Sequence, residues 1–239
     1  MSNICAIAKR ELRGYFDSPV AYIVVIAFLL ISGWMLFSSL FIMGRADLRP
    51  FFSPSPFSPS MLLVILSAAV TMKLVAEERK TGTLEMLTTM PIKDYEVVFG
   101  KFLAGFSLLA SALLLTAAYA ITVAGLGELD WGPVISGYLG LLLFSASLVA
   151  IGLMCSTWTS NQIVAFIVAF ILGAGLYYIY WLQFFLPEFL APIAEYISVS
   201  FHLDNMARGV IDSRDVLYYV TLTAGSLFLA VRSLEQQHA

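Results

Sequence analysis

Charged residues are scarce in this chain. Asp, Glu, Lys and Arg make up 12% of its 239 residues, about half the share usual in soluble domains, while 60% are hydrophobic and the mean hydropathy is +0.88. This composition excludes a soluble enzyme or carrier, and the length leaves no room for a sizeable soluble domain. The chain is therefore an integral membrane protein.

Cysteine, histidine and phosphate-binding motifs are also sparse. Cys5 and Cys155 show no CxxC spacing, which argues against a disulfide framework or a zinc site. His202, Asp204 and Asp212 are spaced irregularly, so we expect surface or hydrogen-bonded roles for them and no metal. The chain has no GxxxxGK[ST] loop, since "GKFLAG" is not one, and it is not expected to bind ATP or to be an enzyme.

What the chain does have is long apolar runs. Six of them, each long enough to cross a bilayer core of about 30 Å, lie at about 19–43, 60–76, 97–125, 133–155, 162–186 and 215–231. They are continuous and not alternating, which favours helices over barrel strands. The first run is too long for a signal peptide and lacks a cleavage site, so we expect it to be retained. The prediction is an all-α polytopic membrane protein with six transmembrane helices and both termini on one side.

The positions of the basic residues predict the orientation. With a cytoplasmic N terminus, nine of the 13 Lys and Arg residues lie inside and four outside. The inside set is Lys9, Arg10, Arg13, Lys73, Arg79, Lys80, Lys93, Lys101 and Arg232, and the outside set is Arg45, Arg49, Arg208 and Arg214. We therefore expect both termini in the cytoplasm.

Residues 1–18 have the pattern of an amphipathic helix. Apolar residues fall on one helical face, and Lys9, Arg10 and Arg13 fall toward the other. Pro19 then separates this helix from the first span. We predict an interfacial helix at the cytoplasmic surface, with a solvated basic leader as the alternative.

The polar stretch "AEERKTGTLEMLTTMP", residues 76–91, stands out between apolar runs. The helix of span two is expected to continue past the membrane edge to Lys80, and Gly82 then to loosen it. Thr83 can cap a short new helix that ends before Pro91 and places Glu85 in its first turn. Leu84, Leu87 and Met90 give that helix an apolar edge, which suits a partner's groove or, alternatively, the membrane surface or the chain's own N-terminal helix.

Three further stretches complete the expected layout. Lys93 and Lys101 follow the polar stretch and are expected to snorkel as the chain re-enters lipid. The aromatic cluster Tyr177, Tyr178, Tyr180 and Trp181 is typical of an aromatic belt at the outer end of span five. The outer segment 187–214 is too polar and proline-broken to span, and it predicts short re-entrant or interfacial helices.

A membrane enzyme is the competing class. Glu77 and Glu78 supply the acid pair of the EExxxR motif of glutamate-type intramembrane proteases, but Arg79 follows directly and position 82 is glycine. The spans also have almost no acidic or histidine residues for a proton relay, which disfavours an antiporter.

The segment "EERKTGTLEMLTTMPIKDYEVVFGKFL" resembles the region between spans two and three of ABC-2 type transporter permeases. The matching positions are Glu78, Gly82, Thr83, Glu85, Leu87, Pro91, Gly100 and Lys101. The stretch "SFHLDNMARGVIDSRDVLYYV" is similar to the branch associated with gliding motility and with copper-site maturation.

The resemblance implies a permease subunit of the bacterial inner membrane, with one transmembrane domain over residues 1–239. It would pair with a second copy or a paralogous permease and bind a separate ATPase that carries ATP and Mg; a partner with a periplasmic domain is a further expectation, and nucleic acid is not. The segment 77–96 would be the coupling helix, with its ATPase contacts at Glu78, Gly82, Thr83, Leu84, Glu85, Leu87 and Pro91, and the N-terminal helix would lie beside it. Export, force transmission and a non-transporting six-span scaffold stay open.

Overall fold

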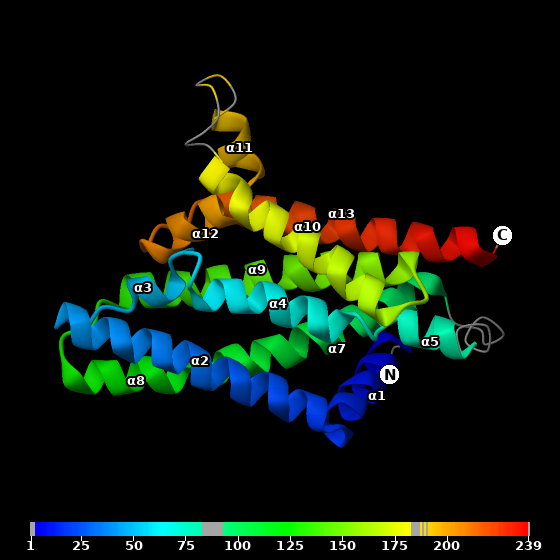
Figure 1. The fold of residues 1–239 in the computed structure, drawn as a ribbon, viewed down its shortest axis with the longest axis horizontal. Helices are drawn as coiled ribbons and strands as arrows, with labels where there is room; N and C mark the ends of the chain where they lie inside the picture. The colour runs from blue at the N-terminus through cyan, green and yellow to red at the C-terminus, as the bar shows by residue number, and fades with distance from the viewer. Residues whose placement is uncertain (1–2, 83–92, 183–186, 188, 190, 239) are drawn as a thin grey trace.

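The computed structural model describes residues 3–82, 93–182, 187, 189 and 191–238, and every regular element within these ranges is a helix (Figure 1). The predicted all-α fold is confirmed. Across the described residues, six helical segments are long and apolar enough to cross a membrane, as the sequence predicted. They are α2 (Pro19–Met43), α4 (Pro59–Thr71) with α5 (Ala76–Thr81), α7 (Asp94–Leu115) with α8 (Ala117–Leu126), α9 (Trp131–Trp158), α10 (Gln162–Leu182) and α13 (Ser213–His238).

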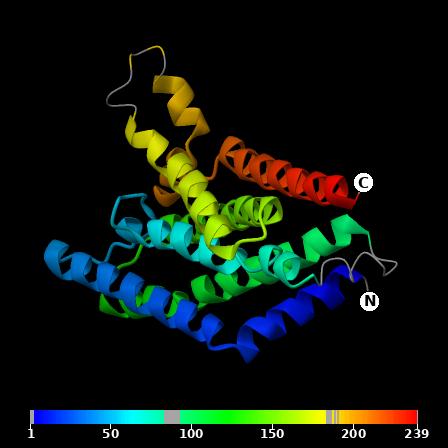
Figure 2. The same ribbon diagram turned by 45° about the vertical axis from the view of Figure 1, so that its right-hand side comes forward.

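The N-terminal helix α1 (Asn3–Asp17) is separated from α2 by a bend at Ser18, next to the proline that begins α2. The two helices meet at an angle, and α1 turns back along the bundle toward α5 (Figures 1 and 2). The N-terminal helix, α5 and the C-terminal end of α13 gather at one end of the molecule (Figure 1).

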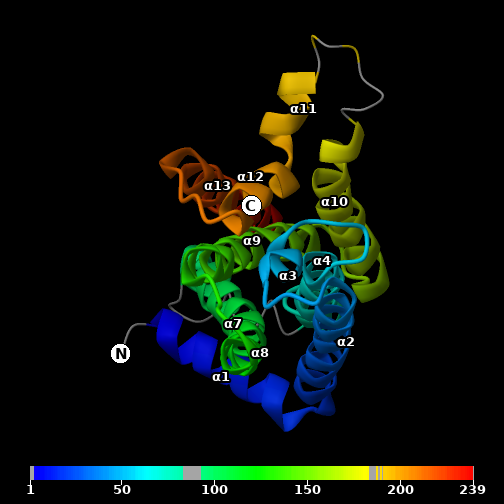
Figure 3. The same ribbon diagram turned by 90° about the vertical axis from the view of Figure 1, so that its left-hand side faces the viewer.

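The centre of the bundle is α9. It packs against α13, α10, α4, α12 and α7, which surround it in the end-on view (Figure 3). In the apolar stretch of α9, 78% of the residues are buried, whereas 22% are buried in the corresponding stretches of α10 and of α13. Small residues allow this close packing: a Cβ on Gly152 would lie 2.1 Å from Thr71 Oγ1, and one on Gly137 would lie 2.4 Å from the Phe52 ring.

Three short helices lie away from α5. The four-residue α3 (Arg49–Phe52) follows α2, and α11 (Ala191–Ile197) and α12 (Val199–Ala207) connect α10 to α13. Short helices between spans five and six were expected from the sequence. In α12 the apolar side packs on α9, where Leu203 and Met206 lie within 3.3 Å of a Cβ built on Gly140.

The aromatic-belt prediction is wrong for Tyr177. Its side chain is fully buried, and its hydroxyl donates to the Ser55 carbonyl oxygen at 2.9 Å and shares hydrogen bonds with Ser58 Oγ and Ser60 Oγ at 3.0 and 2.8 Å. A buried tyrosine needs a partner for its hydroxyl, and serines just before α4 and in its first turn supply it. Tyr177 therefore fastens α10 to α4.

Candidate functional site

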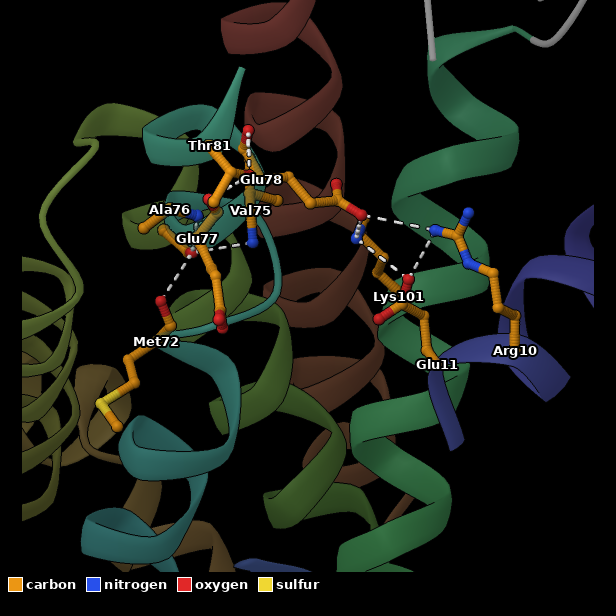
Figure 4. A network of polar contacts seen from close by, with 10 residues as sticks. Arg10, Glu11, Met72, Val75, Ala76, Glu77, Glu78, Thr81 and Lys101 are labelled. Atoms are coloured by element: carbon orange, nitrogen blue, oxygen red, sulfur yellow. Dashed lines mark hydrogen bonds and ion pairs between the residues drawn. The ribbon is translucent and has the colours of Figure 1, made fainter. Parts of the chain in front are cut away.

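A network of charged side chains joins three helices where α1, α5 and α7 meet (Figure 4). At its centre, Lys101 Nζ of α7 lies 2.8 Å from Glu78 Oε1 of α5 and 3.3 Å from Glu11 Oε1 of α1. Arg10 Nη2 lies 2.8 Å from the same Glu11 oxygen and 3.3 Å from the same Glu78 oxygen. Two cations and two carboxylates thus share one site, and their formal charges cancel.

Burial within this network is graded. The Lys101 side chain is only 1% exposed, the two carboxylates are 19% and 18% exposed, and Arg10 is 56% exposed. A buried ammonium is tolerated when carboxylates surround it. The prediction that Lys101 snorkels to the membrane surface is wrong, because its ammonium points into the protein. On the exposed side, the hydrogen bond and charge of Glu11 raise the pKa of Arg10 despite its partial burial.

The close contact between α1 and α7 depends on Gly100, the residue before Lys101. A Cβ on Gly100 would lie 2.7 Å from Ile7 Cγ2 and 3.1 Å from the Ile4 carbonyl oxygen, so a larger residue would push α1 away. The start of α7 adds a polar contact, where Asn3 Nδ2 donates to the Glu96 carboxylate at 3.1 and 3.2 Å. These contacts bring Glu11 within reach of Lys101.

The end of α9 holds α5 from the other side. The Ser156 hydroxyl accepts the backbone N–H groups of Val75 and Ala76 at 3.2 and 3.0 Å, and Arg79 Nη1 donates to the Thr157 carbonyl oxygen at 3.1 Å. The prediction of a continuous helix through span two is wrong. The observed helix stops at Thr71, the chain turns over residues 72–75, and a new helix begins at Ala76. Ser156 accepts hydrogen bonds from backbone N–H groups that the turn leaves without a helical partner.

The predicted coupling residues fall into two groups. Glu78 lies in the charged network, and Gly82 ends α5 with φ +72°, a left-handed conformation that favours glycine. The predicted contacts at Thr83, Leu84, Glu85, Leu87 and Pro91 lie outside the described residues. Of the three basic residues predicted on α1, Arg10 joins the network, while Lys9 and Arg13 are exposed.

Sequence reasoning missed Glu11. It shares a helical face with Ile7 and Tyr15, four residues to either side, and both of these are buried. The Tyr15 hydroxyl donates to the Val70 carbonyl oxygen at 2.7 Å, and burial raises the pKa of this tyrosine well above its ordinary value. An acidic residue at four-residue spacing from two apolar or aromatic residues on the same helical face was the sequence feature that indicated a partner inside the protein.

A second polar cluster lies far from α5, between α12 and α13. His202 Nδ1 lies 2.6 Å from Asp215 Oδ1, and both side chains are almost completely buried. The ring stacks on Tyr218, and Nε2 faces the Tyr196 carbonyl oxygen at 3.1 Å. His202 therefore has a hydrogen-bonded role, with a partner that the sequence did not single out. Asp204 pairs with Arg208, and Asp212 accepts the Arg214 N–H.

We expect His202→Ala to destabilise the fold much more than Arg208→Ala. The first change leaves the buried Asp215 carboxylate, among the residues that the structure describes, with a long 3.4 Å contact from Asn205 as its remaining side-chain partner, which should lower the free energy of unfolding by about 3 kcal/mol. The second removes a pair at the end of α12 whose arginine is exposed, worth less than about 0.5 kcal/mol. Unfolding in mixed detergent micelles measures the free energy of both variants. Equal losses of stability would contradict the stabilising role assigned to the His202–Asp215 contact.

Comparison with known proteins gives one clear result. The model of the family described as "ABC-2 family transporter protein" matches residues 49–231, well over half of the chain. No curated protein matches. The match includes α5 and α7, which carry Glu78 and Lys101, and it begins after the first spanning helix, α2. The chain belongs to the ABC-2 family of transporter proteins and is a membrane permease component of an ABC transporter.

Proposed function

We propose that this chain is the membrane subunit of an ATP-driven ABC-2 complex and that segment 77–96 receives the motion of a separate ATPase. The observation that carries the proposal is the ionic contact of Glu78, in that segment, with Lys101 and, through it, with Glu11. ABC-2 permeases generally work with an ABC ATPase subunit. The energy of ATP would therefore enter this chain from outside.

The contacts of α5 suggest how a push on the segment spreads. Glu78 ties α5 to α1 and α7, while Ser156 and Thr157 tie it to the end of the central helix α9. Because packed helices move as rigid bodies, a displacement of α5 would also displace α7 and α9. The same residues 83–92 that lie outside the described ranges would form the contact with the ATPase.

The orientation that this function requires has independent support. The count of basic residues favours a cytoplasmic N terminus. Both termini lie at the same end as α5 (Figure 1), so the charged network and the segment after it would face the cytoplasm. We place the chain in the bacterial inner membrane, paired with a second copy or a paralogous permease. The gliding-motility branch, a periplasmic partner, and export or force transmission as the work done stay predictions.

Copurification tests the proposal. The tagged chain is expressed with the ABC ATPase encoded beside it, extracted in mild detergent and analysed for subunit ratio. We expect two ATPase copies per two permease copies, with ATP hydrolysis that changes when the permease is bound. A chain that is folded yet never retains an ATPase would overturn the proposal and favour the non-transporting scaffold.

A further inference from the structure

A pocket of about 390 Å³ lies between the C-terminal half of α1 and the turn that joins α4 to α5. On the α1 side it is lined by Glu11, Gly14, Tyr15 and Ser18, and on the other side by Lys73, Leu74, Glu77 and Glu78. Its volume is within the range of small-molecule sites. The hydrogen bond from Tyr15 to the Val70 carbonyl oxygen lies beside it and holds α1 against span two.

Two of the lining charges are not used by the protein itself. Within the part of the chain that the structure describes, Lys73 and the Glu77 carboxylate have no ion pair or side-chain hydrogen bond, whereas Glu11 and Glu78 belong to the charged network. Lys73 and Glu77 are four residues apart, but the turn at 72–75 removes the helical geometry that would pair them. In Figure 4, Glu77 leaves α5 in a different direction from Glu78.

The pocket lies next to the start of the first span. Ser18 forms the bend between α1 and α2, shortly before the candidate span that begins at Ala21. Lys73 follows the end of α4. The first turns of α2 that follow this bend expose Tyr22, Ile23 and Ile26, which are 54%, 63% and 53% exposed. A charged pocket at the start of a span whose first turns expose apolar side chains suits a phospholipid, whose headgroup would enter the pocket and whose acyl chains would lie along α2.

We propose that this pocket binds the headgroup of a phosphatidylethanolamine-type lipid. The Lys73 ammonium would contact the lipid phosphate, and the Glu77 carboxylate would accept N–H groups of the lipid's primary ammonium. An anionic headgroup without an amine would leave Glu77 opposed to negative charge. A quaternary choline would satisfy the charge of Glu77 but donates no hydrogen bond. The inference does not depend on the ATPase.

Native mass spectrometry of the delipidated permease tests this with phosphatidylethanolamine, phosphatidylcholine and phosphatidylglycerol of identical acyl chains. We expect the ethanolamine lipid to bind about two- to fivefold more tightly than the other two, the range of a partly exposed ion pair. Glu77→Gln should abolish the preference over phosphatidylcholine, and Lys73→Gln should weaken all three lipids. Lys80→Gln, an exposed lysine of α5 outside the pocket lining, should change nothing.

A second measurement needs no variant. On the wild-type chain, successive N-methylation of the ethanolamine headgroup removes one N–H donor at a time, and affinity should fall at each step. Equal binding of all headgroups, tighter binding of phosphatidylglycerol, or a preference that survives Glu77→Gln would overturn the proposal. Loss of the bound ATPase in Lys73→Gln without any change in lipid binding would instead assign the pocket to the ATPase contact.

Discussion

Replacing Lys101 with methionine is expected to lower the free energy of unfolding of the permease by about 2 kcal/mol. Methionine keeps much of the length and apolar stem of lysine but removes one of the network's two cations, and the other, Arg10, is 56% exposed. Removing one partner from a buried charge cluster is costly because the remaining charges lose their compensation. The value is set below that of a fully buried pair because both carboxylates are about one fifth exposed. Unfolding in mixed micelles measures the loss.

Two further variants decide whether charge balance is the cause. In Lys101→Met with Glu78→Gln, the remaining Arg10 and Glu11 cancel, and we expect most of the lost stability to return. Lys80→Met removes an exposed lysine of α5 and should be close to neutral. If the double variant is less stable than Lys101→Met alone, the network is not held together by its charges. With the ATPase bound, the double variant should still hydrolyse ATP, but α1 should no longer move together with α5.

The second large effect is expected at the proposed contact with the ATPase. Leu87→Asp should remove copurification of the ATPase while leaving the permease folded. The expectation rests on the helical spacing of Leu84, Leu87 and Met90, since these residues lie outside the described ranges. A carboxylate forced into an apolar groove costs at least about 2 kcal/mol, or about 30-fold in affinity.

The matched control for this change is two residues along the chain. Thr89→Asp introduces the same charge on the opposite face of the helix that the sequence predicts over 84–90, and it should leave copurification unchanged. Equal loss in both variants would mean that added negative charge, and not an apolar edge, disturbs the contact. Retention of the ATPase by Leu87→Asp would remove Leu87 from the interface.

The spans could be predicted from the sequence because each is a local, continuous apolar run. The same is true of two helix ends. Gly82 ends α5 in a left-handed conformation, as its residue type suggested, and the Asn161 side chain accepts the Ile163 N–H at 2.9 Å and caps α10, a position that asparagine favours. In these cases the signal and its effect lie within one or two turns of chain.

What the sequence could not give are contacts between residues far apart in the chain. Lys101 and Glu11 are 90 residues apart, and the packing of α1 on α7, at Gly100 and at the start of α7, brings them together. The break in span two depends on Ser156, about 80 residues away, and no glycine or proline marks it at 72–75. A lysine near a span end was therefore assigned to the membrane surface when its partners were inside the protein.

Photo-crosslinking from position 87 in intact cells is the most direct test of the claim that segment 77–96 receives the ATPase. A photoreactive residue replaces Leu87 in one sample and Phe57 in another. Phe57 is 85% exposed and belongs to the loop before α4, which lies toward the opposite end of the bundle from α5 (Figure 1). We predict an adduct of the permease with the ATPase from position 87 and none from position 57. Adducts from position 87 with lipid or with the permease's own chain alone, in cells that express the ATPase, would contradict the account.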